Sequence, residues 1–271
     1  MEKITANVYV ESKLSMCNSS VVITKDGVVV IDTPMIPANA KKVAAEAERF
    51  GPVRYVINTE PHSDHISGDC YFGGKLVTHE GTRDAILASK VKDFENMLKM
   101  MAPDSLPIPD DFHYRPPDIT FTERLMFYLG GYTFKLINMP GHTPYQVAVY
   151  VPEERIVFTS DNVVVGNMPF LGPSLPGQWL KSLKEYDKLD VDKVVPGHGP
   201  VAEKSAIKQM YKIVKGCLDA VKVAIDKGMS LEEAQEKVTF AEILPGVPEH
   251  VKGVARMNVA RLYEYIKNKE K

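Results

Sequence analysis

VRYVINTEPHSDH, residues 53–65, runs from an apolar segment straight into a polar one. The apolar half predicts a short buried strand. The polar half places Glu60, His62, Asp64 and His65 within six residues, where a loop would follow the strand. Imidazoles and carboxylates are the nitrogen and oxygen ligands of zinc and related metals, so this stretch predicts metal binding.

Three later polar segments also follow apolar, strand-like runs. His142 in PGHTP follows FKLINM, Asp161 in SDN follows RIVF, and His198 in PGHGP follows KVV. Loops at strand ends can direct side chains from a rigid scaffold into one pocket. Together the four segments supply seven nitrogen or oxygen donors, which exceeds the four or five that one zinc takes. They suffice for two metals that share a bridging carboxylate.

Each segment also has a plain structural interpretation. A single histidine is usually satisfied by hydrogen bonds or solvated, and this is the expectation for His79, His113 and His250. HTP and HGP are common in turns, and Asp161 alone would suit a cap or an Asx-turn. The metal interpretation depends on the ordered set of all four segments.

The ordered set resembles the metallo-β-lactamase-fold superfamily, whose pattern is H-x-H-x-D-H, then G-H-T-x, then an Asp after a strand, then P-G-H-G. The matching pieces are Glu60–His65, Gly141-His142-Thr143-Pro144, Ser160-Asp161 and Pro196-Gly197-His198-Gly199, and the early VVVIDTP matches the family's Asp-Thr strand end. The resemblance covers roughly residues 5 to 202. It implies an α/β fold, a four-layer αββα sandwich, with the metal site at one edge of the sheets.

The resemblance also implies roles for the candidate residues. Position 60, His62 and His142 would hold the first metal. Asp64, His65 and His198 would hold the second, and Asp161 would bridge the two. A metal-bound hydroxide would be the nucleophile, because two cations lower the pKa of a shared water. Asp64 would also be catalytic, orienting the hydroxide or passing a proton, and Asp32 would support the motif loop or act as a cap.

Glu60 departs from the family pattern, which has His at this position. A carboxylate can still bind zinc. Three carboxylates and a hydroxide would neutralise two divalent ions, whereas His at position 60 would leave one positive charge. This should weaken Lewis acidity and shift metal preference from zinc toward manganese or iron. A dinuclear hydrolase with two divalent ions, a single-metal enzyme and a chain that has lost hydrolysis all stay open.

The remaining sequence predicts the architecture around these segments. We expect strands at 7–12, 20–24 and 28–32, a helix over 38–50, a strand at 75–79 and a helix near 81–90. Residues 91–118 predict a short helix and an irregular loop, and 132–139, 146–151 and 155–160 predict a second strand series. A helix over 178–189 precedes a helical tail with a capping box at Ser230–Glu233. We interpret 1–271 as a single domain, with an αββα core at 1–202 and a C-terminal helical extension at 203–271. A separate helical subdomain is the alternative.

Composition limits the function classes. A net charge of −2 gives no electrostatic surface for nucleic acid or an anionic membrane. The start lacks the pattern of a signal peptide, and no apolar run reaches membrane-spanning length. Three widely spaced cysteines indicate no disulfide framework and suit a reducing cytoplasm.

We therefore expect a cytoplasmic, metal-dependent hydrolase that acts on a small molecule such as a thioester, lactone, β-lactam or phosphoester. Trp179, Phe170 and the methionines of 97–101 are candidate pocket walls, although each also suits the core. An iron-dependent redox enzyme fits poorly. A mono-iron site would have one histidine and two carboxylates here, whereas the usual site of this kind has two histidines and one carboxylate. A non-catalytic relative is the third possibility, and neither substrate nor oligomeric state is indicated.

Overall fold

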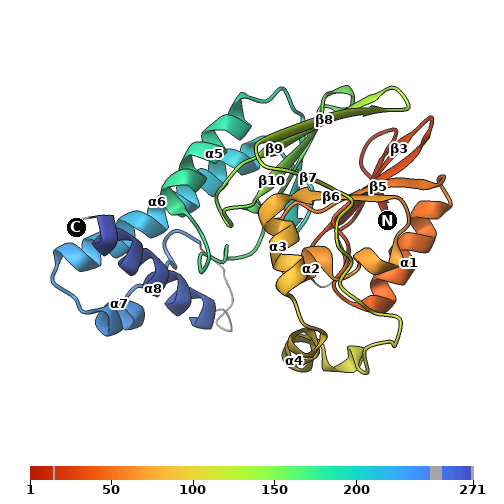
Figure 1. The fold of residues 1–271 in the computed structure, drawn as a ribbon. Coiled ribbons are helices and arrows are strands. Elements are labelled where there is room, and N and C mark those ends of the chain that lie inside the picture. The colour runs from red at the N-terminus through yellow and green to blue at the C-terminus, as the bar shows by residue number, and fades with distance from the viewer. Residues whose placement is uncertain (15, 245–251, 270–271) are drawn as a thin grey trace.

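The computed structural model describes residues 1–14, 16–244 and 252–269. Two β-sheets pack face to face, and helices cover both outer faces (Figure 1). The predicted αββα sandwich is thereby confirmed. None of the helices within these residues is long and apolar enough to cross a membrane.

The first sheet contains seven strands in sequence order. They are β1 (Glu2–Lys3), β2 (Val8–Glu11), β3 (Ser19–Thr24), β4 (Gly27–Ile31), β5 (Val53–Ile57), β6 (Lys75–His79) and β7 (Ile119–Phe121). Strands β1 to β4 pair antiparallel, and β4 to β7 pair parallel. The helices that follow the parallel strands are α1 (Pro37–Glu48), α2 (Ser63–Ile66), α3 (Glu80–Ala88) and α4 (Val91–Met101).

Strand β4 shows how the sequence separates the two faces of this sheet. Successive residues of a strand point to opposite faces. Val28 and Val30 pack with Val43 of α1 on the outer face. Val29 and Ile31 pack between the two sheets. The continuous apolar run of β4 is therefore explained by burial on both sides.

The second sheet contains six strands in the order β13-β12-β11-β10-β9-β8. They are β8 (Arg124–Leu129), β9 (Tyr132–Asn138), β10 (Val147–Val151), β11 (Ile156–Val164), β12 (Lys193–His198) and β13 (Ala202–Glu203). The neighbours β11 and β12 pair parallel, and the other described neighbours pair antiparallel. The parallel pair places the ends of β11 and β12 at the same edge, which is where the candidate metal residues lie.

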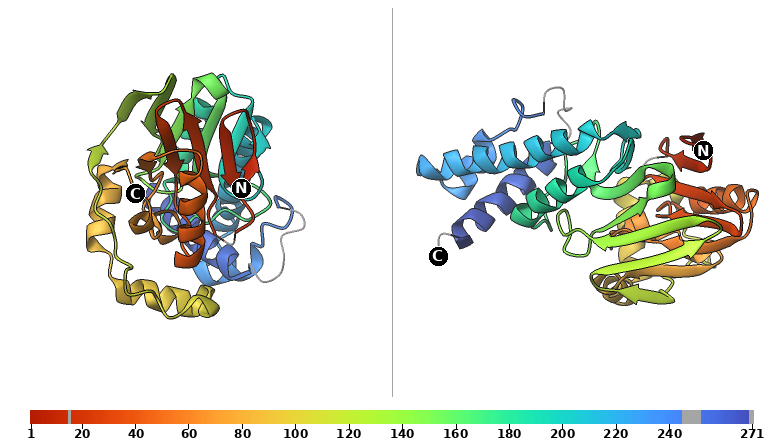
Figure 2. Two further views of the ribbon diagram at one scale, coloured as in Figure 1. Left: turned by 90° about the vertical axis from the view of Figure 1, so that its right-hand side faces the viewer. Right: turned by 90° about the horizontal axis from the view of Figure 1, so that it is seen from above.

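The C-terminal helices extend the outer layer of the second sheet. α5 (Pro176–Lys188) and α6 (Ser205–Asp226) share one apolar cluster with this sheet, and the cluster continues into α7 (Leu231–Lys237) and α8 (Lys252–Lys269). The apolar residues Ile207, Met210 and Val214 of α6 are buried, and the predicted Ser230–Glu233 capping box is present. The helices α6 to α8, blue in Figure 2, project beyond the edge of the sandwich. Whether they form a separate subdomain stays a prediction.

Two sequence predictions need correction. The Ser160–Asn162 segment was expected in a loop after a strand, but it lies inside β11, which continues to Val164 through irregular register. The sequence prediction also missed β7 and β8. Residues 91–118, by contrast, contain a helix, α4, followed by a mostly irregular segment, as expected.

Candidate metal centre

All seven candidate residues meet at one edge of the sandwich. Glu60 and His62 lie in the loop after β5, as the sequence predicted, whereas Asp64 and His65 lie in the short helix α2, where the sequence predicted a loop. His142 follows β9, Asp161 lies in β11, and His198 is the last residue of β12. Both sheets therefore contribute to the site.

The first group of donor atoms comes from Glu60, His62 and His142, which lie within 4.8 Å of one another. The His62 Nδ1 lies 2.8 Å from Glu60 Oε2. The His142 Nε2 lies 3.2 Å from His62 Nδ1 and 3.8 Å from Glu60 Oε2. This is the set that the resemblance assigns to the first metal.

The second group comes from Asp64, His65 and His198, again within 4.8 Å. The Asp64 Oδ2 lies 3.2 Å from His198 Nε2 and 3.7 Å from His65 Nε2. Asp161 stands between the groups, because its Oδ1 is 3.4 Å from His65 Nε2 and its Oδ2 is 3.6 Å from His142 Nε2. Its position suits the bridging role that the resemblance implies, although ligation itself stays a prediction.

Glu60 also faces both groups, which the sequence did not predict. Its Oε2 faces His62, whereas its Oε1 lies 3.1 Å from His65 Nε2. The side chain is completely buried, and within the described residues the atoms close to its two oxygens are imidazole nitrogens of His62 and His65. His65 Nε2 thus has two carboxylate oxygens nearby, Glu60 Oε1 at 3.1 Å and Asp161 Oδ1 at 3.4 Å. Imidazole nitrogens and carboxylate oxygens buried this close together, with donor atoms within 4.8 Å of one another, fit divalent metal binding.

Asp32 supports the motif loop from the end of β4. Its carboxylate accepts hydrogen bonds from the Thr59 backbone at 2.8 Å and the Thr59 hydroxyl at 2.5 Å. Its Oδ2 also lies 3.0 Å from His65 Nδ1. A carboxylate at Nδ1 favours the tautomer that leaves Nε2 free as a metal ligand.

Further buried residues hold the backbone around His65, and sequence reasoning did not find them. The His65 carbonyl accepts hydrogen bonds from Thr33 Oγ1 at 3.2 Å and Asn58 Nδ2 at 3.1 Å. Both donors also bond to Asp69 Oδ1. Burial raises the pKa of Asp69 to about 7 despite these hydrogen bonds. Thr33 belongs to the Asp-Thr strand end noted in the sequence, whereas Asn58 and Asp69 carry no motif signal, since their roles depend on contacts formed only in the fold.

Asn18 connects the first sheet to the His198 loop, and it was also missed. Its side-chain amide donates to the carbonyls of Pro196 and Gly199, at 2.8 Å each. Its backbone N–H donates to the Gly197 carbonyl at 2.7 Å. Three hydrogen bonds from one residue therefore fix the backbone on both sides of His198.

The loop before His142 is held by Asn162 and Trp179. Asn162 Oδ1 accepts from the His142 backbone N–H at 2.9 Å, and its amide donates to the Met139 carbonyl at 2.6 Å. Trp179 Nε1 donates to the Asn162 carbonyl at 3.0 Å. A Cβ on Gly141 would lie 2.1 Å from Asn162 Oδ1, which explains the glycine of the PGH segment.

The imidazole of His142 is fixed by the Phe170 carbonyl, which lies 2.7 Å from His142 Nδ1. A carbonyl oxygen only accepts hydrogen bonds, so Nδ1 carries the proton. In the neutral ring Nε2 is then unprotonated and faces the candidate metal position. Phe170 thus acts through its backbone.

The charges at the centre strongly affect one another's titration. Burial opposes protonation of His62, but the Glu60 carboxylate outweighs it and raises the pKa of His62 to about 9. Burial likewise opposes charge on His198, and Asp161 and Asp64 raise its pKa to about 10. Although burial disfavours the Asp64 carboxylate, His65 and His198 lower its pKa to about 2. The cluster favours positive charge at its centre, which protons or metal ions can supply.

The histidines outside the site behave as single histidines usually do. His79 Nδ1 accepts from the Gly81 backbone N–H at the start of α3, and its Nε2 lies 2.8 Å from the Thr122 carbonyl. His113 is exposed. His250 lies outside the described residues.

The residues proposed as pocket walls differ in their distance from the candidate metal centre and in their burial. Trp179 is fully buried in the apolar cluster and belongs to the core. Phe170 lies beside His142, with a ring separation of 6.4 Å. Met100 of α4 is 81% exposed and points to solvent.

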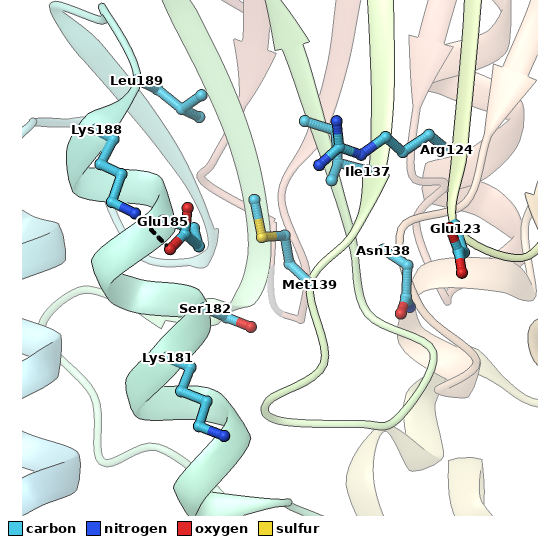
Figure 3. Close-up of a pocket in the computed structure, with 10 residues that line it drawn as sticks. All are labelled: Glu123, Arg124, Ile137, Asn138, Met139, Lys181, Ser182, Glu185, Lys188 and Leu189. Atoms are coloured by element: carbon cyan, nitrogen blue, oxygen red, sulfur yellow. Dashed lines mark hydrogen bonds and ion pairs between the residues drawn. The ribbon is translucent and has the colours of Figure 1, made fainter.

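A separate groove of about 550 Å³ lies between α5 and strands β8 and β9 (Figure 3). Its lining includes the cations Arg124, Lys181 and Lys188 together with Glu123 and Glu185. Lys188 pairs with Glu185 at 2.6 Å. None of the seven candidate metal residues lines this groove, so its size does not identify it as the reaction site.

Comparison with known proteins agrees with this geometry. The family model of the metallo-β-lactamase superfamily matches residues 13–198, and the chain belongs to this superfamily. Members of the superfamily are mostly hydrolases, and the site is a candidate for divalent metal binding.

Similarity to individual curated proteins is distant. The chain is 26% identical over 213 residues to the 2,4-dinitroanisole O-demethylase subunit alpha of Nocardioides sp. strain JS1661, covering 74% of this chain and 59% of that protein. It is 27% identical over 152 residues to the β-lactamase-like protein 2 homolog of Caenorhabditis elegans, covering 56% and 44%. The chain thus spans about half the length of these two relatives. It is 23% identical to metallo-β-lactamase type 2 of Elizabethkingia meningoseptica, covering 79% and 84%.

Solved structures show the same fold. A metallo-β-lactamase family protein of Thermus thermophilus matches with a TM-score of 0.71 at 15% identity, over 98% of this chain and 95% of that chain. The sec-alkylsulfatase Pisa1 of Pseudomonas sp. matches with a TM-score of 0.75 at 13% identity, over 97% of this chain and 49% of that chain. Both matches extend beyond the sandwich into the C-terminal helices.

Proposed function

We propose that this chain is a metal-dependent hydrolase with a dinuclear site that acts on a small molecule. The observation that carries the proposal is the convergence of four imidazoles and three carboxylates at one edge of the sandwich, with the completely buried Glu60 carboxylate between them. The two donor groups suit two divalent ions, with Asp161 between them. When bound, the ions would supply an activated water as nucleophile and polarise the substrate's scissile group.

Asp64 is the residue we assign to proton transfer. Its carboxylate contacts His198 and is partly exposed, whereas Glu60 is completely buried. A proton acceptor must reach both the attacking water and the leaving group, which requires an accessible position. Asp64 therefore combines metal ligation with orientation of the water.

Glu60 sets the expected metal preference. Because its two oxygens face the two donor groups separately, the carboxylate is placed to contact both ions. Two bridging carboxylates would add negative charge and favour harder cations. We propose zinc as the resident metal, with manganese or iron as the alternatives that Glu60 makes accessible.

The activities of the relatives guide the choice of test substrates. They include β-lactamases and a hydroxyacylglutathione hydrolase of Ruegeria pomeroyi, 32% identical over 90 residues. A suitable panel comprises a chromogenic β-lactam, a hydroxyacylglutathione, a lactone, and aryl esters of acetate and phosphate. A cytoplasmic location and the absence of nucleic-acid partners remain part of the proposal.

The first test is elemental analysis of protein purified without added metal, for the wild type and Glu60→His. We expect close to two metal ions per chain in the wild type. Glu60→His should show equal or higher zinc-supported hydrolysis on the panel, because a neutral ligand restores positive charge at the centre. His113→Ala, which changes an exposed histidine away from the site, is the matched control and should match the wild type.

Two results would contradict the proposal. One is protein without bound metal in which His62→Ala leaves every tested activity unchanged. The other is one iron per chain with oxygen consumption on thiol substrates, which would replace hydrolysis with redox chemistry.

A further inference from the structure

Asn258 of α8 is a polar side chain in an apolar environment. It is 0% exposed, and its helix neighbours Val259 and Leu262 belong to the apolar cluster between α5, α6 and α8. Burying an amide is costly unless its hydrogen bonds are made. Those hydrogen bonds indicate what Asn258 does.

Both ends of the Asn258 amide bind one short loop segment. Its Oδ1 accepts from the Leu171 backbone N–H at 2.7 Å, and its Nδ2 donates to the Pro169 carbonyl at 2.8 Å. The residue between these two contacts is Phe170, whose carbonyl binds His142 Nδ1. Phe170 therefore connects Asn258 to the candidate metal ligand His142.

The same helix holds this loop at further points. Arg261 donates to the Ser174 carbonyl through Nε at 3.2 Å and Nη2 at 2.7 Å. The Tyr265 hydroxyl accepts from the Gly177 backbone N–H at 3.1 Å, at the start of α5. The helix α8 therefore contacts the segment between β11 and α5 on both sides of Phe170, at Ser174 and at the start of α5.

We infer that Asn258 is a positioning residue for the first metal position, acting through Phe170 on the His142 imidazole. By fixing the Pro169 carbonyl and the Leu171 N–H, it fixes the plane and direction of the Phe170 carbonyl. That carbonyl holds His142 in the tautomer whose Nε2 faces Glu60 and His62. The inference rests on the metal centre of the proposed function and adds the C-terminal helix to it.

The geometry predicts a selective effect. In the second donor group, Asp64 and His65 lie in α2 after the first sheet, and Asn18 fixes the backbone around His198 at the end of β12. Loss of the Asn258 hydrogen bonds should weaken binding at the first position and leave the second unchanged. A purely structural role would instead lower stability and affect both positions alike.

The test is cobalt(II) titration of metal-free protein, followed by absorption spectroscopy and by competition with a chelator. The variants are Asn258→Ala, His142→Ala as the reference for loss of the first position, and Val259→Ala as the control. Val259 is equally buried in α8, and its side chain has no hydrogen-bonding group. If Asn258→Ala does not fold, Asn258→Leu replaces it, because leucine fills the same space without forming hydrogen bonds.

We expect the wild type to bind two cobalt ions. Asn258→Ala should lose about 10- to 100-fold in affinity for one of them, the ion that His142→Ala also loses. Val259→Ala should unfold at lower temperature with both affinities unchanged. If Asn258→Ala binds both ions like the wild type, or weakens both equally, the inference is wrong while the hydrolase proposal stands. A wild type that binds no cobalt overturns the proposed metal centre itself.

Discussion

Gly197 lies near the end of β12, where the backbone passes close to Asp161 of the neighbouring strand β11. A Cβ at this position would stand 1.8 Å from Asp161 Oδ1 and 2.7 Å from its backbone nitrogen. No side chain fits such a distance, so the glycine is required by close approach. The PGH motif therefore reflects packing against a candidate metal ligand as well as turn geometry.

We predict that Gly197→Ala displaces Asp161 and impairs binding of both metal ions. Overpacking of this kind typically costs about 1–3 kcal/mol of unfolding free energy. Denaturant unfolding and metal stoichiometry would measure the two effects. Gly73→Ala is the matched control, since a Cβ there meets no atom within 4 Å, and it should change neither quantity. Full metal binding by Gly197→Ala would contradict this account.

The histidines of the centre give the metal-free protein a distinct pH dependence. His62 and His198 have folded-state pKa values of about 9 and about 10, above the ordinary value of 6.5. Between pH 6.5 and 10 the folded protein therefore holds protons that the unfolded chain has released. Unfolding free energy must fall as pH rises through this range.

We predict that the metal-free protein loses stability from pH 6.5 to 10, whereas the metal-loaded protein does not, because cations replace the protons. Chemical unfolding across this pH range in chelator and in excess zinc measures both curves. Since ligation displaces these protons, zinc binding should also release protons into an unbuffered solution. Parallel curves with and without metal would refute the assignment of these two histidines to the site.

The seven candidate donors could be found from the sequence because metal-binding residue types occur there in a recognisable order and spacing. The residues that hold them could not be found in this way. Asn18 lies more than a hundred residues from the loop it fixes, and Phe170 contributes only a carbonyl, which every residue carries. Such roles arise from tertiary contacts and leave no local pattern.

At the scale of elements, β11 shows why a strand boundary was misjudged. SDN carries polar residues that commonly form turns. The strand nevertheless continues, with Ser160 at a positive φ of 49° and register shifts on both sides. The irregular pairing directs Asp161 toward the site within a strand. The polar residues Ser160 to Asn162 were therefore mistaken for the end of the strand, although they lie within it.

The capping box at the start of α7 was predicted and confirmed, and its contribution can be measured. Ser230 Oγ accepts from the Glu233 backbone N–H at 3.2 Å, and the Glu233 carboxylate accepts from the Ser230 N–H at 2.9 Å. Ser230→Ala should lower unfolding free energy by about 1 kcal/mol. Glu236→Ala, an exposed change in the same helix, should be close to neutral. Equal effects from both variants in thermal unfolding would argue against the cap.

At the scale of the whole molecule, the metal centre joins two halves that are otherwise separate sheets. Glu60 to His65 come from the first sheet, whereas His142, Asp161 and His198 come from the second. The apolar layer between the sheets holds them together away from this edge. At the edge itself, three carboxylates and four imidazoles from the two sheets lie close together. Bound cations would therefore stabilise the arrangement of the two sheets as well as supply chemistry.

We predict that metal removal destabilises the protein without unfolding it. Ligand linkage gives about 2.7 kcal/mol at a free zinc concentration of roughly 100 times the dissociation constant, and each kcal/mol shifts the Tm of a domain this size by roughly 2–4 °C. Chelation should therefore lower the Tm by roughly 5–10 °C, and added zinc should restore it. In His62→Ala the shift should be smaller, because the first donor group is incomplete, whereas His113→Ala should behave like the wild type. An unchanged Tm on chelation would mean that the two sheets meet at this edge without help from metal.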